Sequence, residues 1–153
     1  MSQILNSLSV WLHALATIIF IGYFLLLALI YLPVLGTKDL STLSEISKRS
    51  RPWMYVSLLI FAITGVYLTL VDPNYLGLAN FGNLWAILML VKHLLILGMI
   101  AIGFWFNVIL RVGPMLNSNH GAVSAIGLYR LYVNLMAIAG FLLLLLTAFA
   151  QVE

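Results

Sequence analysis

Charged residues are scarce in this chain. Of its 153 residues, seven are Lys or Arg and four are Asp or Glu, so charged side chains make up 7% of the sequence, whereas a soluble domain carries about 25%. Eleven charges are too few to coat a globule of this size in water. The shortage excludes a cytosolic enzyme, a nucleic-acid-binding module and a disordered chain.

Cysteine is absent altogether. Its absence excludes disulfides, iron–sulfur clusters, thiolate metal sites and covalently attached c-type haem. Apolar residues, by contrast, make up 64% of the chain, and the mean hydropathy is +1.15. A chain of this length and composition is expected to form one domain, residues 1–153, embedded in a lipid bilayer.

Four apolar runs are long enough to cross a membrane as helices, which takes about 20 residues each. None of them alternates as the strands of a β-barrel do. Pro52 opens the second run and suits the first turn of a helix, where its missing N–H does no harm. The sequence therefore predicts an all-α polytopic membrane protein, an antiparallel bundle of four transmembrane helices over residues 8–35, 52–71, 83–110 and 123–150.

The basic residues predict how this bundle is oriented. They gather beside the first and third connections, whereas the N-terminus, the second connection and the C-terminus have none. The positive-inside rule then places both termini outside the cytoplasm, in a membrane of the bacterial inner (plasma) type. The residues in question are Lys38, Lys48, Arg49, Arg51, Arg111 and Arg130.

Three ionisable residues fall at membrane depth: His13, Lys92 and His93. Each costs at least about 2.5–3.5 kcal/mol there, so each calls for a reason. The two histidines lie on parallel spans, in the extracytoplasmic half. At the rise of an α-helix, His13 is about 13 Å and His93 about 6 Å from the centre of its span.

Two histidines on different helices of a four-helix bundle are the usual protein ligands of b-type haem. We expect His13 and His93 to be the axial ligands of the haem iron, between the first and third spans. Mid-span glycines leave room for a flat porphyrin, although small residues are common at all contacts between membrane helices. These glycines are Gly22, Gly65 and Gly98, with Gly140 in the fourth span.

The histidines and the lysine also have interpretations other than haem ligation. His13 suits an interfacial histidine that is hydrogen-bonded to water or headgroups, and His120 lies in a polar, solvated connection. Lys92 either snorkels outward, pairs with a haem propionate, or is itself a ligand or proton carrier. Met89, one turn from His93, is a rival axial ligand.

Short motifs in the chain resemble those of a known superfamily. Residues 11–15 (Trp-Leu-His-Ala-Leu) and 31–33 (Tyr-Leu-Pro) resemble the first helix of the HemJ-type protoporphyrinogen oxidases and the related copper-resistance protein D membrane domains. Thr64-Gly65, Lys92, and Asn107 followed by Arg111 and Pro114 resemble the same superfamily.

The resemblance implies a four-helix membrane protein with b-type haem, His13 as a ligand and Lys92 as a residue that matters for activity. Two positions depart from the HemJ pattern. Val34 replaces the basic residue that often follows Leu-Pro, and His93 is not part of the pattern.

Four functions are compatible with these features. The first is a cytochrome b that transfers electrons through one haem, with a quinone or porphyrin, a redox partner subunit or a second copy in a homodimer as partner. The others are a protoporphyrinogen oxidase, a copper-handling membrane protein, and an accessory subunit without a cofactor. No nucleic-acid partner is expected.

Overall fold

The computed structural model describes residues 2–35, 39–75, 77, 82–110 and 122–150. Every regular element in these residues is a helix. Four helical runs are long and apolar enough to cross a membrane, which confirms the all-α, multi-pass prediction. The elements are α1 (Ser2–Leu26), η1 (Leu27–Tyr31), α2 (Leu32–Leu35), α3 (Leu40–Val71), α4 (Leu84–Phe104), η2 (Trp105–Ile109) and α6 (Ala122–Ala150).

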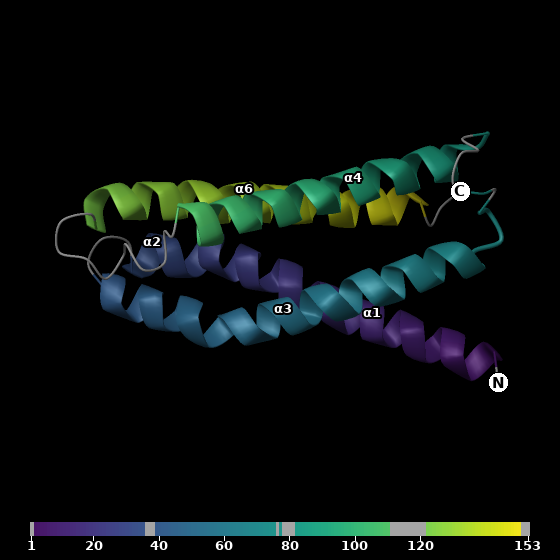
Figure 1. Cartoon of the computed structure of the whole chain (residues 1–153), viewed down its shortest axis with the longest axis horizontal. Coiled ribbons are helices and arrows are strands. Elements are labelled where there is room, and N and C mark those ends of the chain that lie inside the picture. The colour runs from purple at the N-terminus through teal and green to yellow at the C-terminus, as the bar shows by residue number, and fades with distance from the viewer. Residues whose placement is uncertain (1, 36–38, 76, 78–81, 111–121, 151–153) are drawn as a thin grey trace.

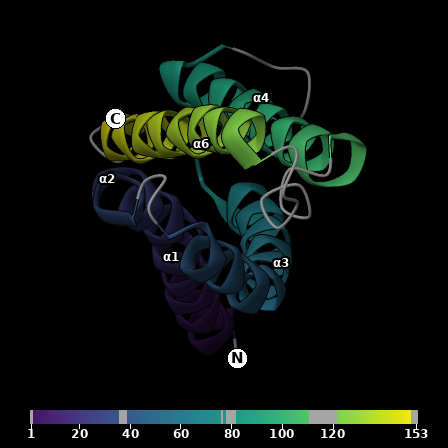
Figure 2. The ribbon, with the colours of Figure 1, turned by 90° about the vertical axis from the view of Figure 1, so that its left-hand side faces the viewer.

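The four runs form an antiparallel bundle with both chain ends at one end of the molecule (Figure 1). Helix α1 packs against α3 and α6, and α4 packs against α6. Seen end-on, α1 with α3 and α4 with α6 form two layers (Figure 2). Helices α1 and α4, which carry the two membrane-depth histidines, therefore occupy diagonal positions.

The first span is one continuous helix, Gln3–Leu35, that begins earlier than the predicted residue 8. It contains a π-helical turn, η1, in which the N–H of Leu32 donates to the carbonyl of Leu27. Pro33 follows directly. Proline has no N–H to donate, and its ring clashes with the carbonyl four residues earlier, so the wider turn accommodates it without ending the helix.

The second span corrects one prediction. Helix α3 begins at Leu40 rather than at Pro52, which lies inside it. The helix starts there because Asp39 caps it: one carboxylate oxygen accepts from the backbone N–H of Thr42 at 2.9 Å and from the Ser41 hydroxyl at 2.8 Å. Capping of this kind satisfies backbone donors that the first turn leaves unpaired.

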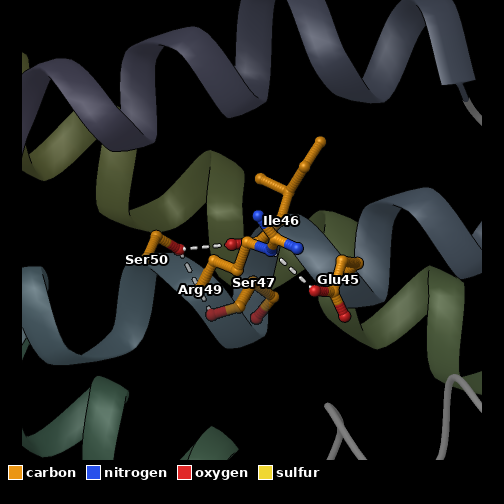
Figure 3. A network of polar contacts seen from close by, with 5 residues as sticks. All are labelled: Glu45, Ile46, Ser47, Arg49 and Ser50. Atoms are coloured by element: carbon orange, nitrogen blue, oxygen red, sulfur yellow. Dashed lines mark hydrogen bonds and ion pairs between the residues drawn. The ribbon is translucent and has the colours of Figure 1, made fainter.

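The polar part of α3 includes an exposed ion pair (Figure 3). Arg49 pairs with Glu45 one turn away, with 2.7 Å between Nε and Oε1, and both side chains are exposed. The hydroxyl of Ser50 donates to the carbonyls of Ile46, at 2.7 Å, and Ser47, at 3.2 Å. Hydroxyl groups that bond back to the helix in this way bend it. An internal proline has the same effect, and α3 is visibly curved (Figure 1).

The third and fourth spans agree with their predicted ranges to within about a residue. Asn83 caps α4 by accepting from the N–H of Ala86 at 2.8 Å. The span ends in a second π-helical turn, η2, in which the side chain of Asn107 donates to the carbonyl of Gly103 at 2.9 Å. This bond holds the Asn107 amide against its own helix.

The surface of the bundle is apolar. Leu29 and Ile18 expose 72% and 69% of their area, as many other aliphatic side chains do along every span. Such a surface is stable against lipid and not against water. The molecule is therefore a multi-pass membrane protein.

A core nonetheless runs along the bundle axis. At mid-height it holds Ala16, Phe20, Ile21, Phe24, Phe61, Met99, Met136, Ala137 and Leu143. Helices α1 and α6 approach closely here, because a Cβ atom on Gly140 would lie 2.9 Å from Cγ2 of Ile21. A second buried cluster fills the end remote from the termini and holds Leu27, Leu32, Leu43, Ala125, Ile126, Tyr129 and Val133.

Candidate functional site

His13 lies against α3, and its ring is held there on three sides. Its Nδ1 is 2.9 Å from the hydroxyl oxygen of Thr64. The ring stacks on Phe61, with centroids 4.5 Å apart and planes inclined by 23°. Gly65 lies on the third side, because a Cβ atom there would lie 3.2 Å from Cε1 of His13. Thr64, Phe61 and Gly65 are together called the seat of His13.

The bond to Thr64 identifies the tautomer of His13. The hydroxyl of Thr64 is 2.6 Å from the carbonyl oxygen of Ile60 and donates its one hydrogen there. It therefore accepts from Nδ1–H of His13. In a neutral imidazole with hydrogen on Nδ1, Nε2 carries a free lone pair. This is the nitrogen that a metal or a hydrogen-bond donor would use.

His93 also carries a hydrogen on Nδ1, but its acceptor is a backbone carbonyl. Its Nδ1 lies 2.7 Å from the backbone carbonyl of Met89, one turn earlier on α4. A carbonyl only accepts, so Nδ1 donates, and in a neutral imidazole Nε2 then carries the free lone pair. An oxygen acceptor on Nδ1 is the usual companion of a histidine that binds metal through Nε2.

Lys92 is on the inward face of α4. Seven residues separate it from Met99, which is 2% exposed, so the two lie within about 20° of each other around the helix. The Lys92 ammonium is close enough to act electrostatically on His13 and on the carboxylate of Asp72 at the end of α3. His93 lies about 120° away from Met99, at the flank of α4.

The predicted glycines do not share one environment. Gly65 touches His13 directly. A Cβ atom on Gly22 or Gly98 would meet nothing within 4 Å, and the hollow beside Gly22 is lined by α1 and η1 residues alone. His120 lies outside the described residues. Within the described ranges, no three His, Asp or Glu residues gather as a metal cluster would require.

An interhelical cavity lies elsewhere, towards the end of the bundle remote from the termini. It has a volume of about 210 Å³ and is lined by residues from all four spans. Its apolar wall includes Phe20, Phe24, Leu58, Met99 and Met136. Its polar groups include Tyr23, Ser47, Arg51, Asn107, Tyr129 and Tyr132.

The sequence does not mark these polar residues as one site. Arg51 was interpreted as a topology signal, and Asn107 entered only through the resemblance. The spacing of Ser47, Arg51, Met54 and Leu58 places them on one helical face, but an internal proline at residue 52 argued against a helix through that segment.

Comparisons of this chain with protein-family models, with curated proteins and with solved structures gave no match. Function is therefore inferred from the residues themselves.

Proposed function

We propose that this protein binds one b-type haem between α1 and α4 and transfers electrons through it in the membrane. His13 from α1 and His93 from α4 would hold the haem iron, and Lys92 would pair with a propionate. A haem supplies a reversible one-electron couple when bound. The residues fit such a group by their chemistry, since Nδ1 of each histidine donates to an oxygen, which leaves Nε2 of the neutral imidazole as the nitrogen for iron.

The observation that carries the proposal is the seat of His13. A histidine at membrane depth needs partners for both nitrogens. Thr64 satisfies Nδ1, Phe61 and Gly65 fix the ring, and Nε2 is left with a lone pair. Such an arrangement orients an imidazole for a ligand and fixes its tautomer beforehand.

The test is the reduced-minus-oxidised optical spectrum of protein purified from haem-replete cells. The proposal expects a b-type α band from low-spin iron. Purified protein without colour would contradict it.

Four variants then identify the ligands. His13→Ala and His93→Ala should each yield high-spin or haem-free protein, whereas Lys92→Met should keep the haem and shift its potential. Met89→Leu should leave the spectrum unchanged. A low-spin spectrum that persists in His93→Ala but is lost in Lys92→Met would assign the second position to the lysine, which faces the interior more directly.

A protoporphyrinogen oxidase is the second candidate, favoured by the inward position of Lys92 within electrostatic range of His13. It predicts that the wild-type chain rescues a strain lacking that enzyme, while Lys92→Met retains haem but fails to rescue. If the haem-loaded wild-type protein does not rescue the strain, this candidate is excluded.

A further inference from the structure

The cavity near the remote end of the bundle contains a cation, Arg51, that forms no ion pair with any described residue. Arg51 lines it, and Nε of Arg51 is the buried side-chain nitrogen that has no hydrogen-bond partner within the described part of the chain. The acids described near the start of α3 are engaged elsewhere, Asp39 in the helix cap and Glu45 with Arg49. A buried guanidinium donor without an acceptor is unfavourable unless a ligand supplies one.

The Tyr132 hydroxyl, which lines the same cavity, also offers a hydrogen. Nδ2 of Asn107 donates to the hydroxyl oxygen of Tyr132 at 3.3 Å. The hydroxyl hydrogen of Tyr132 is therefore directed away from Asn107. No acceptor for it is found among the described residues. Together with Arg51, this hydroxyl forms a set of donors that an oxyanion matches best.

The rest of the cavity is apolar and opens sideways. Its lining includes Tyr55 on α3 and Phe104 on α4, which are 62% and 58% exposed. Helices α3 and α4 are not among the pairs that pack extensively. The mouth of the cavity therefore lies between them, on the lipid-facing surface of the bundle.

The volume is smaller than the roughly 300–1,000 Å³ of pockets that enclose a whole drug-sized ligand. It suits the headgroup and the first part of the acyl chain of a lipid, and the rest of the acyl chain would extend through the mouth into the bilayer.

From this combination we infer that the cavity binds an acyl-chain amphiphile with an acidic headgroup. Arg51 and Tyr132 hold the oxyanion, and the chain lies along Phe104 and Leu58 towards the lipid. A carboxylate and a phosphate share this chemistry, so a free fatty acid and an anionic phospholipid are the two sources. The inference does not depend on haem binding, which concerns residues at the other end of the bundle.

Equilibrium binding to the purified full chain in neutral detergent tests it, with oleate, methyl oleate and dioleoyl phosphatidic acid as probes. Saturable binding of oleate or phosphatidic acid at least about tenfold tighter than methyl oleate is expected, because hydrogen bonds to charged groups contribute about 1.5–3 kcal/mol. Tighter oleate identifies a free fatty acid, and tighter phosphatidic acid identifies a phospholipid. Equal binding of the ester and both anions would overturn the inference.

Variants locate the site. Arg51→Met should weaken the preferred anion about tenfold or more, whereas Arg49→Met, on the same helix but exposed, should bind like the wild type. Gly103 lines the cavity, and a Cβ atom there would have the Tyr132 hydroxyl as its nearest neighbour, at 3.9 Å. Gly103→Leu should therefore fill the cavity and block binding. Anion binding unchanged in both Arg51→Met and Gly103→Leu would show that the ligand binds elsewhere.

Discussion

The hydrogen bond between His13 and Thr64 is the most informative single contact in the described structure. Thr64 is buried and receives Nδ1–H of the imidazole while donating to its own helix. The contact thus determines which nitrogen of His13 is available to a ligand.

Thr64→Val tests this role. It keeps the shape of the side chain but removes the acceptor, so the free energy of unfolding should fall by about 1–3 kcal/mol. Thr69→Val is the matched control, because among the described residues the Thr69 hydroxyl bonds the carbonyl of Gly65 on its own helix, at 2.8 Å, and no other helix. Thermal unfolding in detergent compares the two. Equal losses of stability would show that the His13 contact contributes nothing of its own.

Gly65→Ala tests the seat of the same ring. The added methyl group would meet Cε1 of His13 at 3.2 Å, closer than an ordinary contact. The ring must then shift by a few tenths of an ångström. Haem content, or the spectrum of the bound haem, should change in Gly65→Ala and stay unchanged in Gly127→Ala on α6, where the methyl group meets open space. The same response in both variants would contradict a seat specific to His13.

At the scale of the helices, the contact between α1 and α6 depends on a glycine. Gly140→Ala places a methyl group 2.9 Å from Cγ2 of Ile21, and overpacking of this kind destabilises by about 1–3 kcal/mol. Ile21→Ala in the same chain should relieve most of the overpacking, so the two losses should not add. Unfolding measured over the full double-mutant cycle checks this. Additive losses would indicate that the helices adjust without strain.

The stability that the Asp39 cap gives to the start of α3 should depend on pH. Hydrogen bonds from the Thr42 side chain, the Thr42 backbone and Ser41 lower the pKa of Asp39 below its ordinary value of 3.8. A carboxyl group whose pKa is lower in the folded state stabilises the fold above the ordinary pKa, and that contribution disappears as the pH falls through the folded value.

Asp39→Asn keeps a capping side chain that does not titrate. The wild type should therefore lose stability relative to Asp39→Asn as the pH is lowered below about 4, since the unfolded carboxyl group titrates near 3.9. Unfolding curves of both proteins between neutral and acidic pH measure the difference. A constant difference across this range would rule out the charged cap as its cause.

The position of this cap also explains why the start of α3 was predicted too late. Apolar runs are sufficient to locate membrane spans, and the predicted ranges of the third and fourth spans agree with the structure. The segment before Pro52 is polar, so hydropathy does not mark it as helix, and proline is a typical first-turn residue. The Asp39 cap, with the Ser41 and Thr42 side chains, extends the helix beyond the apolar run.

At the scale of the whole molecule, the site was predicted less completely than the fold. His13 and Lys92 stood out because ionisable residues are rare in membrane spans. The sequence does not predict in which direction these two side chains face within the bundle, because the residues around them are hydrophobic on every side of the helix. The cavity around Arg51 depends on how four helices diverge, which no local pattern encodes.

The orientation of the bundle remains a prediction that single cysteines can test, since the chain has none of its own. Asn74→Cys lies in the connection at the end that holds both termini, and Ser41→Cys lies at the opposite end; both positions are exposed. In intact cells, a membrane-impermeant maleimide should label Asn74→Cys and spare Ser41→Cys. The reverse pattern would place the termini in the cytoplasm.

The most direct test of the central claim is the haem-to-protein ratio of two histidine variants purified side by side. His120→Ala removes the histidine of a polar connection and should retain about one haem per chain. His13→Ala removes the imidazole seated on Thr64, Phe61 and Gly65 and should lose most of its haem or bind it in a high-spin form. Equal haem content with unchanged low-spin spectra in the two variants would contradict the account.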